Sequence, residues 1–125
     1  MCENIVVSSL PKSWIIDLDG TIVKHNGYIL DGHDTLLEGS KDFLSNIQED
    51  DMVIIITSRT VEYAQCTEAF LKEQGIHYNH IIYGVPYGER ILVNDRKPSG
   101  LKTAIALNVK RDVGVTSKFT ISPAL

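Results

Sequence analysis

The chain has 125 residues, of which 43% are hydrophobic, and a net charge of −4 from 12 basic and 16 acidic residues. A chain of this length is typical of a single domain with one core, so we expect one domain over residues 1–125. The acidic balance argues against a broad surface for duplex nucleic acid, which needs clustered Lys and Arg, but leaves room for a local basic pocket that binds one phosphate.

Short apolar runs alternate with helical segments along the chain. Residues 13–18 are rich in β-branched and aromatic types and predict a buried strand that an Asp-Gly pair closes. Residues 22–37 fit neither the helical nor the strand periodicity, and we interpret them as a hairpin-like flap. Ser40 is a candidate N-cap of a helix that ends near Gln48.

The second predicted strand, residues 52–57, is an almost continuous apolar run, which is typical of a strand covered on both faces in a parallel sheet. Thr60 is a candidate cap of a longer helix that Gly75 ends. Three further strands are predicted at residues 81–83, 91–93 and 104–109. This alternation indicates an α/β fold with a three-layer, Rossmann-like parallel sheet. Residues 112–125 are weakly patterned and receive no assignment.

Polar residues follow three of the predicted strands. These residues are Asp17-Leu18-Asp19-Gly20-Thr21 after the first strand, Thr57-Ser58-Arg59 after the second, and Asn94-Asp95-Arg96-Lys97 after the fourth. Ligands bind at the carboxyl ends of the strands in such sheets, so we expect these residues to converge on one edge. Asp17 and Asp19 are two residues apart in an extended segment and can face one ligand together.

The carboxylates of this edge favour phosphate chemistry with a metal ion. Close carboxylates repel one another, and Asp95 would add a third to Asp17 and Asp19, which a hard cation such as Mg²⁺ would offset. Asp17 could attack a metal-bound phosphate, while Asp19 protonates the leaving oxygen and later activates water. The hydroxyl of Thr57 and one cationic side chain would neutralise the phosphate oxygens.

Three segments resemble motifs of a known family. The DLDGT sequence at residues 17–21 resembles the DxDGT signature of the haloacid dehalogenase superfamily of phosphohydrolases. Residues 54–57 resemble its second motif, an apolar strand that ends in Thr or Ser, and residues 92–95 resemble its acidic fourth motif. The segments occur in the order of the family, and the resemblance covers about residues 12–110.

The resemblance implies roles for individual residues. Asp17 would be the nucleophile and Asp19 the general acid and base. Mg²⁺ would be held by the Asp17 carboxylate, the backbone carbonyl of Asp19 and the Asp95 carboxylate. Thr57 and the backbone after it, at Ser58, would bind the phosphate.

The third motif of the superfamily is where the sequence departs from the pattern. That motif supplies a Lys or Arg, often on a helix before the acidic strand, and the short stretch between Gly84 and Ile91 leaves no room for such a helix. We take Arg90 as the first candidate for the phosphate-binding cation and Lys97 as the second. The candidates ranked below them are Arg59 and Arg96.

Other polar residues near these motifs receive weaker interpretations. Asn94 either orients a metal-bound water or closes a turn. In the flap, His25 and His33 could touch the substrate, but we interpret them as solvated loop residues. We interpret Asp31 and Asp34 as turn formers. The residues expected to shape a leaving-group pocket are Tyr83, Tyr87 and Gly88.

The expected function is that of a Mg²⁺-dependent phosphomonoesterase that acts on a small phosphorylated substrate. The sequence is similar to small bacterial proteins of surface-sugar biosynthesis, which suggests a phosphorylated sugar or its nucleotide conjugate. The chain has no room for a large cap domain, so the flap, or a second copy of the chain in a homo-oligomer, would cover the site. Residues 94–96 are also similar to polynucleotide-kinase phosphatase domains, so a nucleic-acid 3′-phosphate stays a candidate substrate. The net negative charge of the chain argues against this substrate.

Two other classes of function stay open. One is a catalytically silent, haloacid-dehalogenase-like module that binds or assembles with a partner. The other is a phospho-accepting receiver domain, although the second strand ends in Thr57, where a receiver would carry its acid.

The location expected from the sequence is the cytoplasm. The longest apolar runs are far shorter than the ~20 residues of a membrane span. No basic region followed by an apolar stretch opens the chain, which argues against a signal peptide. Cys2 and Cys66 do not make a disulfide framework.

Overall fold

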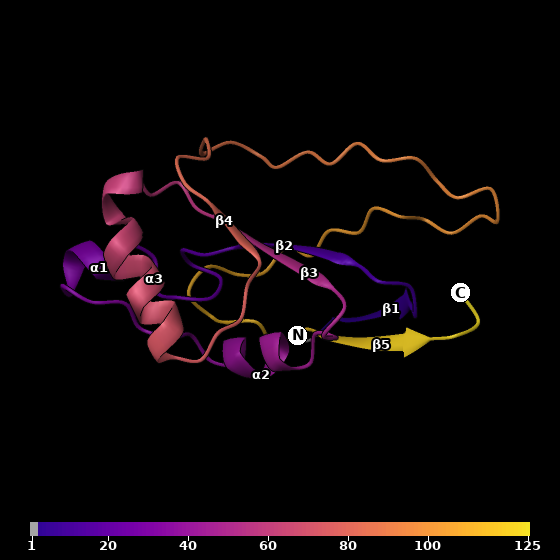
Figure 1. Cartoon of the computed structure of the whole chain (residues 1–125), viewed down its shortest axis with the longest axis horizontal. Coiled ribbons are helices and arrows are strands. Elements are labelled where there is room, and N and C mark those ends of the chain that lie inside the picture. Colours follow the sequence, from indigo (N-terminus) through magenta and orange to yellow (C-terminus); the bar gives the residue numbers. More distant parts are fainter. Residues whose placement is uncertain (1–2) are drawn as a thin grey trace.

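The computed structural model describes residues 3–125, so Cys2 lies outside the described residues. These residues form an α/β arrangement in which parallel strands build two small sheets and the helices are short (Figure 1). Within the described part of the chain, no helix is long and apolar enough to cross a membrane.

The three-stranded sheet carries the residues of the candidate site. Strand β3 (Met52–Ile56) lies between β2 (Ser13–Asp17) and β4 (His80–Ile82), and all three run parallel. Their β-branched residues favour the extended conformation. The first three predicted strands are therefore confirmed to within one residue at their ends. Asp17 is paired with Ile56, so both strands end at the same edge of the sheet.

The two-stranded sheet was not predicted. It pairs β1 (Asn4–Ser8) with β5 (Lys118–Ser122) in parallel, and Ile5 lies opposite Phe119. The two strands are separated by most of the chain, so local periodicity contains no sign of their pairing. Residues 112–125 are therefore partly a strand rather than an unpatterned tail.

Helices occur at both places where the sequence predicts them. Helix α2 spans Ser40–Ser45 and ends before the predicted limit at Gln48. Helix α3 spans Ala64–Glu73 and follows a single 3₁₀ turn, η1, at Val61–Tyr63. Gly75 comes shortly after α3 with a φ of 71°, a left-handed conformation that is typical of the residue ending a helix.

The flap, residues 22–37, turns back on itself as a hairpin does. Val23 bridges Leu36 in antiparallel fashion, and the Leu37 amide donates to the Ile22 carbonyl at 2.9 Å. The tip carries the short helix α1 (Gly27–Leu30), which the sequence analysis did not predict.

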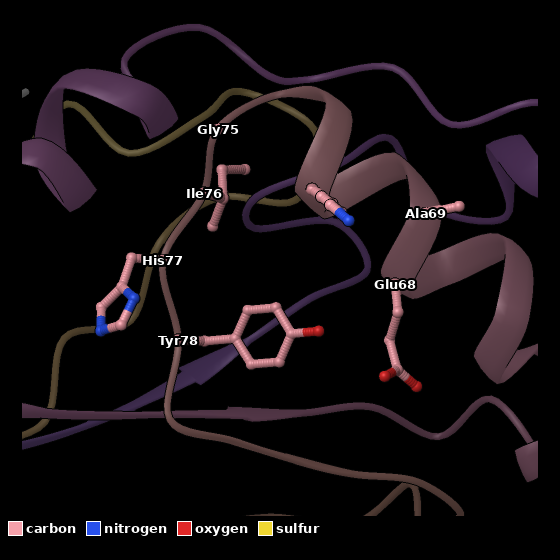
Figure 2. Close-up of a pocket in the computed structure, with 7 residues that line it drawn as sticks. Glu68, Ala69, Gly75, Ile76, His77 and Tyr78 are labelled. Atoms are coloured by element: carbon pink, nitrogen blue, oxygen red, sulfur yellow. The ribbon is translucent and has the colours of Figure 1, made fainter.

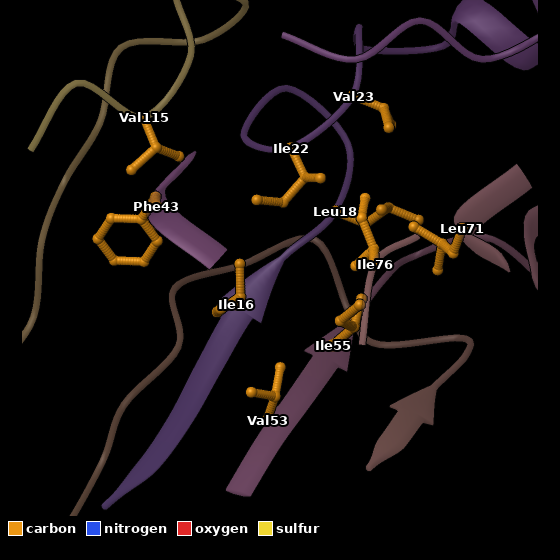
Figure 3. Packing of buried hydrophobic residues seen from close by; sticks show 10 residues of the cluster. All are labelled: Ile16, Leu18, Ile22, Val23, Phe43, Val53, Ile55, Leu71, Ile76 and Val115. Carbon is orange, nitrogen blue, oxygen red and sulfur yellow. The ribbon is translucent and has the colours of Figure 1, made fainter. Parts of the chain in front are cut away.

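One continuous cluster of apolar side chains forms the core (Figure 3). Ile55 of β3 and Leu71 of α3 are fully buried in it, beside Leu18 from the loop after β2. The Trp14 ring joins the sheets, because its centroid lies 4.8 Å from the Phe119 ring of β5. Burial of these side chains supplies the main free energy that holds β2, β3 and α3 together.

Only one face of the three-stranded sheet is covered. Helices α2 and α3 both contribute to the cluster that contains Val53 and Ile55. On the opposite face, Ile15 is 53% exposed and Ile82 is 50% exposed. Within residues 3–125, no helix packs on this second face, so the expectation that β3 is covered on both sides is not met.

The strands predicted at residues 91–93 and 104–109 are wrong. Residues 91–109, here called the outer segment, contain no regular secondary structure and run away from the sheet before they return (Figure 1). Ile91 is 84% exposed and Val93 is 89% exposed. An apolar run forms a strand only where it finds a pairing partner, and the outer segment pairs with no strand of the described residues.

Candidate functional site

A cavity of about 130 Å³ opens at the carboxyl ends of β2 and β3 and is called the Asp17 cavity. The cavity is lined by residues at the ends of β2 and β3, in the flap, in the segment after β4 and in the segment before β5. The lining residues that bear on its chemistry are Asp17, Asp19, His25, Ser58, Arg59, Arg90 and Arg111. The sequence-based expectation that strand ends gather polar residues on one edge is met for the first two strands.

Asp17 is the last residue of β2, and its side chain is 37% exposed toward the cavity. The Thr21 hydroxyl donates to Oδ2 at 3.1 Å, and Nη2 of Arg90 lies 3.7 Å from Oδ1. Burial raises the pKa of Asp17, while the contacts with Thr21 and Arg90 oppose that rise. Arg90, the first candidate for the cation, therefore lies where it can share a phosphate with Asp17.

Asp19 is held by two neighbours rather than left free. The Thr57 hydroxyl donates to Oδ2 at 2.8 Å, and Nη2 of Arg59 lies 2.8 Å from Oδ1. Thr57 is fully buried and does not line the cavity, so its hydroxyl orients Asp19. Ser58 does line the cavity, and its hydroxyl donates to the Val85 carbonyl at 2.7 Å.

Arg59 is the most densely bonded residue of the site. Its side chain is 1% exposed, and it donates to Asp19, to Asp34 and to the Thr67 hydroxyl. Its guanidinium also lies 3.8 Å from the centre of the Tyr28 ring, a cation–π contact. Burial opposes its charge, but the hydrogen bonds to Asp34 and Asp19 outweigh burial and raise the pKa of Arg59.

One sequence-based interpretation is corrected by this network. Asp34 is more than a turn former, because its side chain is 4% exposed and pairs with Arg59. Arg59, ranked low as a phosphate-binding cation, joins the flap to the end of β3. Its position directly after a strand end was the available signal, but nothing in the sequence identified Asp34 as its partner.

His25 also differs from its interpretation as a solvated residue. It is half-buried and lines the Asp17 cavity. Its Nδ1 is buried and finds no hydrogen-bond partner among residues 3–125. Arg111, which the sequence analysis did not single out, lines the same cavity from the chain before β5.

Asp95 and Lys97 lie in the outer segment and do not line the Asp17 cavity. The Asn94 amide donates to the Thr103 hydroxyl at 2.7 Å, and that hydroxyl donates to the Asp95 carbonyl. Asn94 therefore bonds across the loop of residues 94–103, a role related to the turn closure that was the second of its two interpretations. The structure does not bring Asp95 to Asp17 and Asp19, because the outer segment is not a strand beside β2.

The residues of the Asp17 cavity fit a magnesium ion only as a minimal site, in which one protein carboxylate is the ligand. In the part of the chain that the structure describes, no cluster of three or more acidic, histidine or cysteine side chains is placed to hold a metal. Among residues 3–125, Asp17 has one carboxylate oxygen that accepts no hydrogen bond, whereas both oxygens of Asp19 are engaged. Mg²⁺ often binds one carboxylate together with waters and a substrate phosphate, which Asp17 could satisfy.

A larger depression, of about 530 Å³, lies away from these residues at the end of α3 (Figure 2). The hydroxyl of Tyr78 is directed toward Glu68 across it, whereas His77 points away. Glu68 already accepts a hydrogen bond from Tyr83 at 2.9 Å. This depression gathers no set of acids and cations like that of the Asp17 cavity, so we place the candidate chemistry in the smaller cavity.

The chain matches no model of a protein family, and comparisons with curated proteins and with solved structures find no match. The functional argument therefore rests on the residues of the Asp17 cavity and on the motifs that the sequence contains.

Proposed function

We propose that the chain is a phosphomonoesterase of the haloacid dehalogenase type, with Asp17 as its nucleophile. One observation carries this proposal. The carboxylate of Asp17, at the end of a parallel strand, is open to a cavity and has the Arg90 guanidinium 3.7 Å away. A carboxylate beside a cation at such a strand end is suited to attack a phosphate whose charge the cation offsets.

The proposed reaction has two steps. Asp17 attacks phosphorus, the bond from phosphorus to the ester oxygen breaks, and Asp19 gives a proton to the leaving oxygen. Asp19 then takes a proton from water, which attacks the aspartyl-phosphate and releases phosphate with Asp17 restored. For this role, Asp19 must exchange one of its contacts, to Thr57 or to Arg59, when the substrate binds.

Mg²⁺ belongs to the proposal as the cation that offsets phosphate charge. Asp17 would hold it through its carboxylate, and Asp19 through its backbone carbonyl, together with the substrate phosphate. Asp95 would join them only if the outer segment moved toward β2.

The three-layer sheet expected from the sequence is part of the same proposal. Ile15 and Ile82 leave an apolar face of the sheet open, and Ile91 and Val93 are apolar residues without cover. Packing of the outer segment on that face would bury both sets. Hydrogen exchange that is slow at residues 91–93 would support this layer, and fast exchange would contradict it.

Phosphate release with Mg²⁺ tests the proposal, with sugar phosphates, nucleotides and 3′-phosphorylated oligonucleotides as substrates. Asp17→Asn is the blank, and Asp50→Asn, an exposed residue, is the control with the same charge change. We expect release that Asp50→Asn retains and Asp17→Asn loses. Equal release by wild type and Asp17→Asn would exclude the aspartyl-phosphate mechanism.

A silent binding module is the second candidate function. The engaged oxygens of Asp19 and the distance of Asp95 from the cavity favour it. It predicts that the wild-type protein binds inorganic phosphate in a way that Asp17→Asn alters, but hydrolyses none of the esters.

A further inference from the structure

The Asp17 cavity contains more guanidinium groups than one phosphate needs. Arg59, Arg90 and Arg111 all line it. Arg59 is neutralised within the protein, because it pairs with two buried or nearly buried carboxylates. Arg90 lies beside Asp17, where the reacting phosphate would bind. The positive charge of Arg111 is left without an assigned role.

The backbone around Arg111 is fixed against the loop that follows β2. The Asp112 amide donates to the Gly20 carbonyl at 2.9 Å, and the His25 amide donates to Asp112 Oδ1 at 2.7 Å. Asp112 has a φ of 63°, a left-handed conformation that residues other than glycine rarely adopt. Such conformations persist where the surroundings hold them, often at functional sites.

The Arg111 side chain lies over Gly20, and a Cβ at Gly20 would lie 3.1 Å from Arg111 Cγ. Because glycine has no Cβ, the Arg111 side chain can lie this close to the backbone at position 20. Within residues 3–125, no carboxylate lies within 4.0 Å of the Arg111 guanidinium. Its donors are thus available to a ligand.

His25 lines the cavity together with Arg111. A buried polar atom without a partner is costly, and Nδ1 of His25 is such an atom among the described residues. A polar ligand group in the cavity would supply the missing hydrogen bond. The backbones of the two segments are joined at Asp112, the residue after Arg111, whose carboxylate accepts from the His25 amide and whose own amide donates to the Gly20 carbonyl.

We propose that Arg111 and His25 form a second anion subsite next to the phosphate position, so that the substrate is a phosphate ester with a further phosphate or a carboxylate. This inference rests on the proposed function for the identity of the first anion. Within residues 3–125, no carboxylate lies within 4.0 Å of the Arg111 guanidinium, so an anionic group of the ligand beside Arg111 would offset a charge that the protein leaves unpaired. The second group accepts charge-assisted hydrogen bonds from Arg111.

Calorimetric binding to the Asp17→Asn protein with Mg²⁺ tests the subsite without turnover. The probes are glycerol 3-phosphate, which has one anionic group, and 3-phosphoglycerate and 2,3-bisphosphoglycerate, which have more. We expect the last two to bind about tenfold tighter than the first, as one hydrogen bond to a charged group provides. The affinity ratio compares the probes that have more than one anionic group with glycerol 3-phosphate. Adding Arg111→Gln should bring this ratio close to one and leave glycerol 3-phosphate binding little changed.

Lys110→Gln is the matched control, because it removes the same charge from an exposed neighbour outside the cavity. His25→Ala is the second variant and should lower the ratio in part. An affinity ratio near one in the parent protein, or equal losses in Arg111→Gln and Lys110→Gln, would overturn the subsite. Phosphate release by the wild type is measured separately. Tighter binding of the probes with a second anionic group, without hydrolysis of any ester, rejects only the proposed phosphatase activity. Hydrolysis without that difference in binding rejects only the subsite.

Discussion

The guanidinium of Arg59 donates to both carboxylate oxygens of Asp34, at 3.0 Å and 2.6 Å. Arg59 follows β3 and Asp34 belongs to the flap, so this fork connects the sheet edge to the segment that borders the cavity. The same guanidinium bonds to Asp19. The position of the flap and the orientation of Asp19 therefore depend on one side chain.

Arg59→Met should destabilise the protein by about 3 kcal/mol, because it leaves the buried Asp34 carboxylate without its partner. The free energy of unfolding in urea measures this loss. Asp34→Asn should cost less, since Arg59 keeps its contact with Asp19. The double variant should be more stable than the sum of the two single losses predicts. Simple additivity would show that the pair does not act as a unit.

Asp17→Asn should raise the thermal stability at pH 7. Burial raises the pKa of Asp17 above its value in the unfolded chain, so the ionised carboxylate is less favourable in the fold than in water. The folded state gains from this group only when it is protonated, and that gain is lost as pH rises through the raised pKa. The advantage of Asn over Asp should therefore shrink as pH falls and vanish below about pH 3.9, the ordinary pKa of Asp.

Thermal melts of wild type and Asp17→Asn at pH 7, 5 and 3.5 measure this dependence. Asp50→Asn, at an exposed position, controls for the change in net charge. A melting difference that grows as pH falls would contradict the assigned direction of the Asp17 shift.

The sequence predicted the parts of the fold that depend on local pattern. Continuous apolar runs located β2 and β3, and a change to helical periodicity located α3. The pattern of polar residues directly after a predicted strand indicated that Asp17 and Asp19 lie at the same edge of the sheet. Arg90 was placed near the phosphate position because it directly precedes the predicted strand at Ile91, and it reaches Asp17 although that strand does not form.

The features that the sequence did not reveal depend on distant partners. The pairing of Ile5 with Phe119 and the ion pair of Arg59 with Asp34 join segments far apart in the chain. The exposed run at residues 91–93 has strand-like composition without a partner strand, so composition alone gave the wrong prediction.

Asp51→Asn should destabilise the protein by about 2 kcal/mol. The Asp51 side chain is fully buried and accepts hydrogen bonds from the Lys12 amide and from Trp14 Nε1, both at 2.9 Å. Asparagine presents a donor where one of these donors already points, which leaves a buried group unpaired. Trp14 is the only tryptophan, so its fluorescence follows urea unfolding directly. The neighbouring exposed change, Asp50→Asn, should alter stability little, and a similar loss in both variants would contradict the role of Asp51.

In the arrangement that the structure describes, as opposed to the packed third layer proposed above, brief digestion with trypsin should cleave the outer segment before any other part of the protein. Arg96 and Lys102 are exposed there, on backbone without regular secondary structure, whereas Pro98 protects the bond after Lys97. A protease needs an extended, accessible backbone, which residues in a packed helix provide only after local unfolding. Lys72 in α3 is therefore the internal control and should be cut later. Mass spectrometry of the first fragments measures the order of cleavage. First cuts at Lys72 would contradict this order, and an outer segment that resists digestion as long as the core does would support the packed third layer instead.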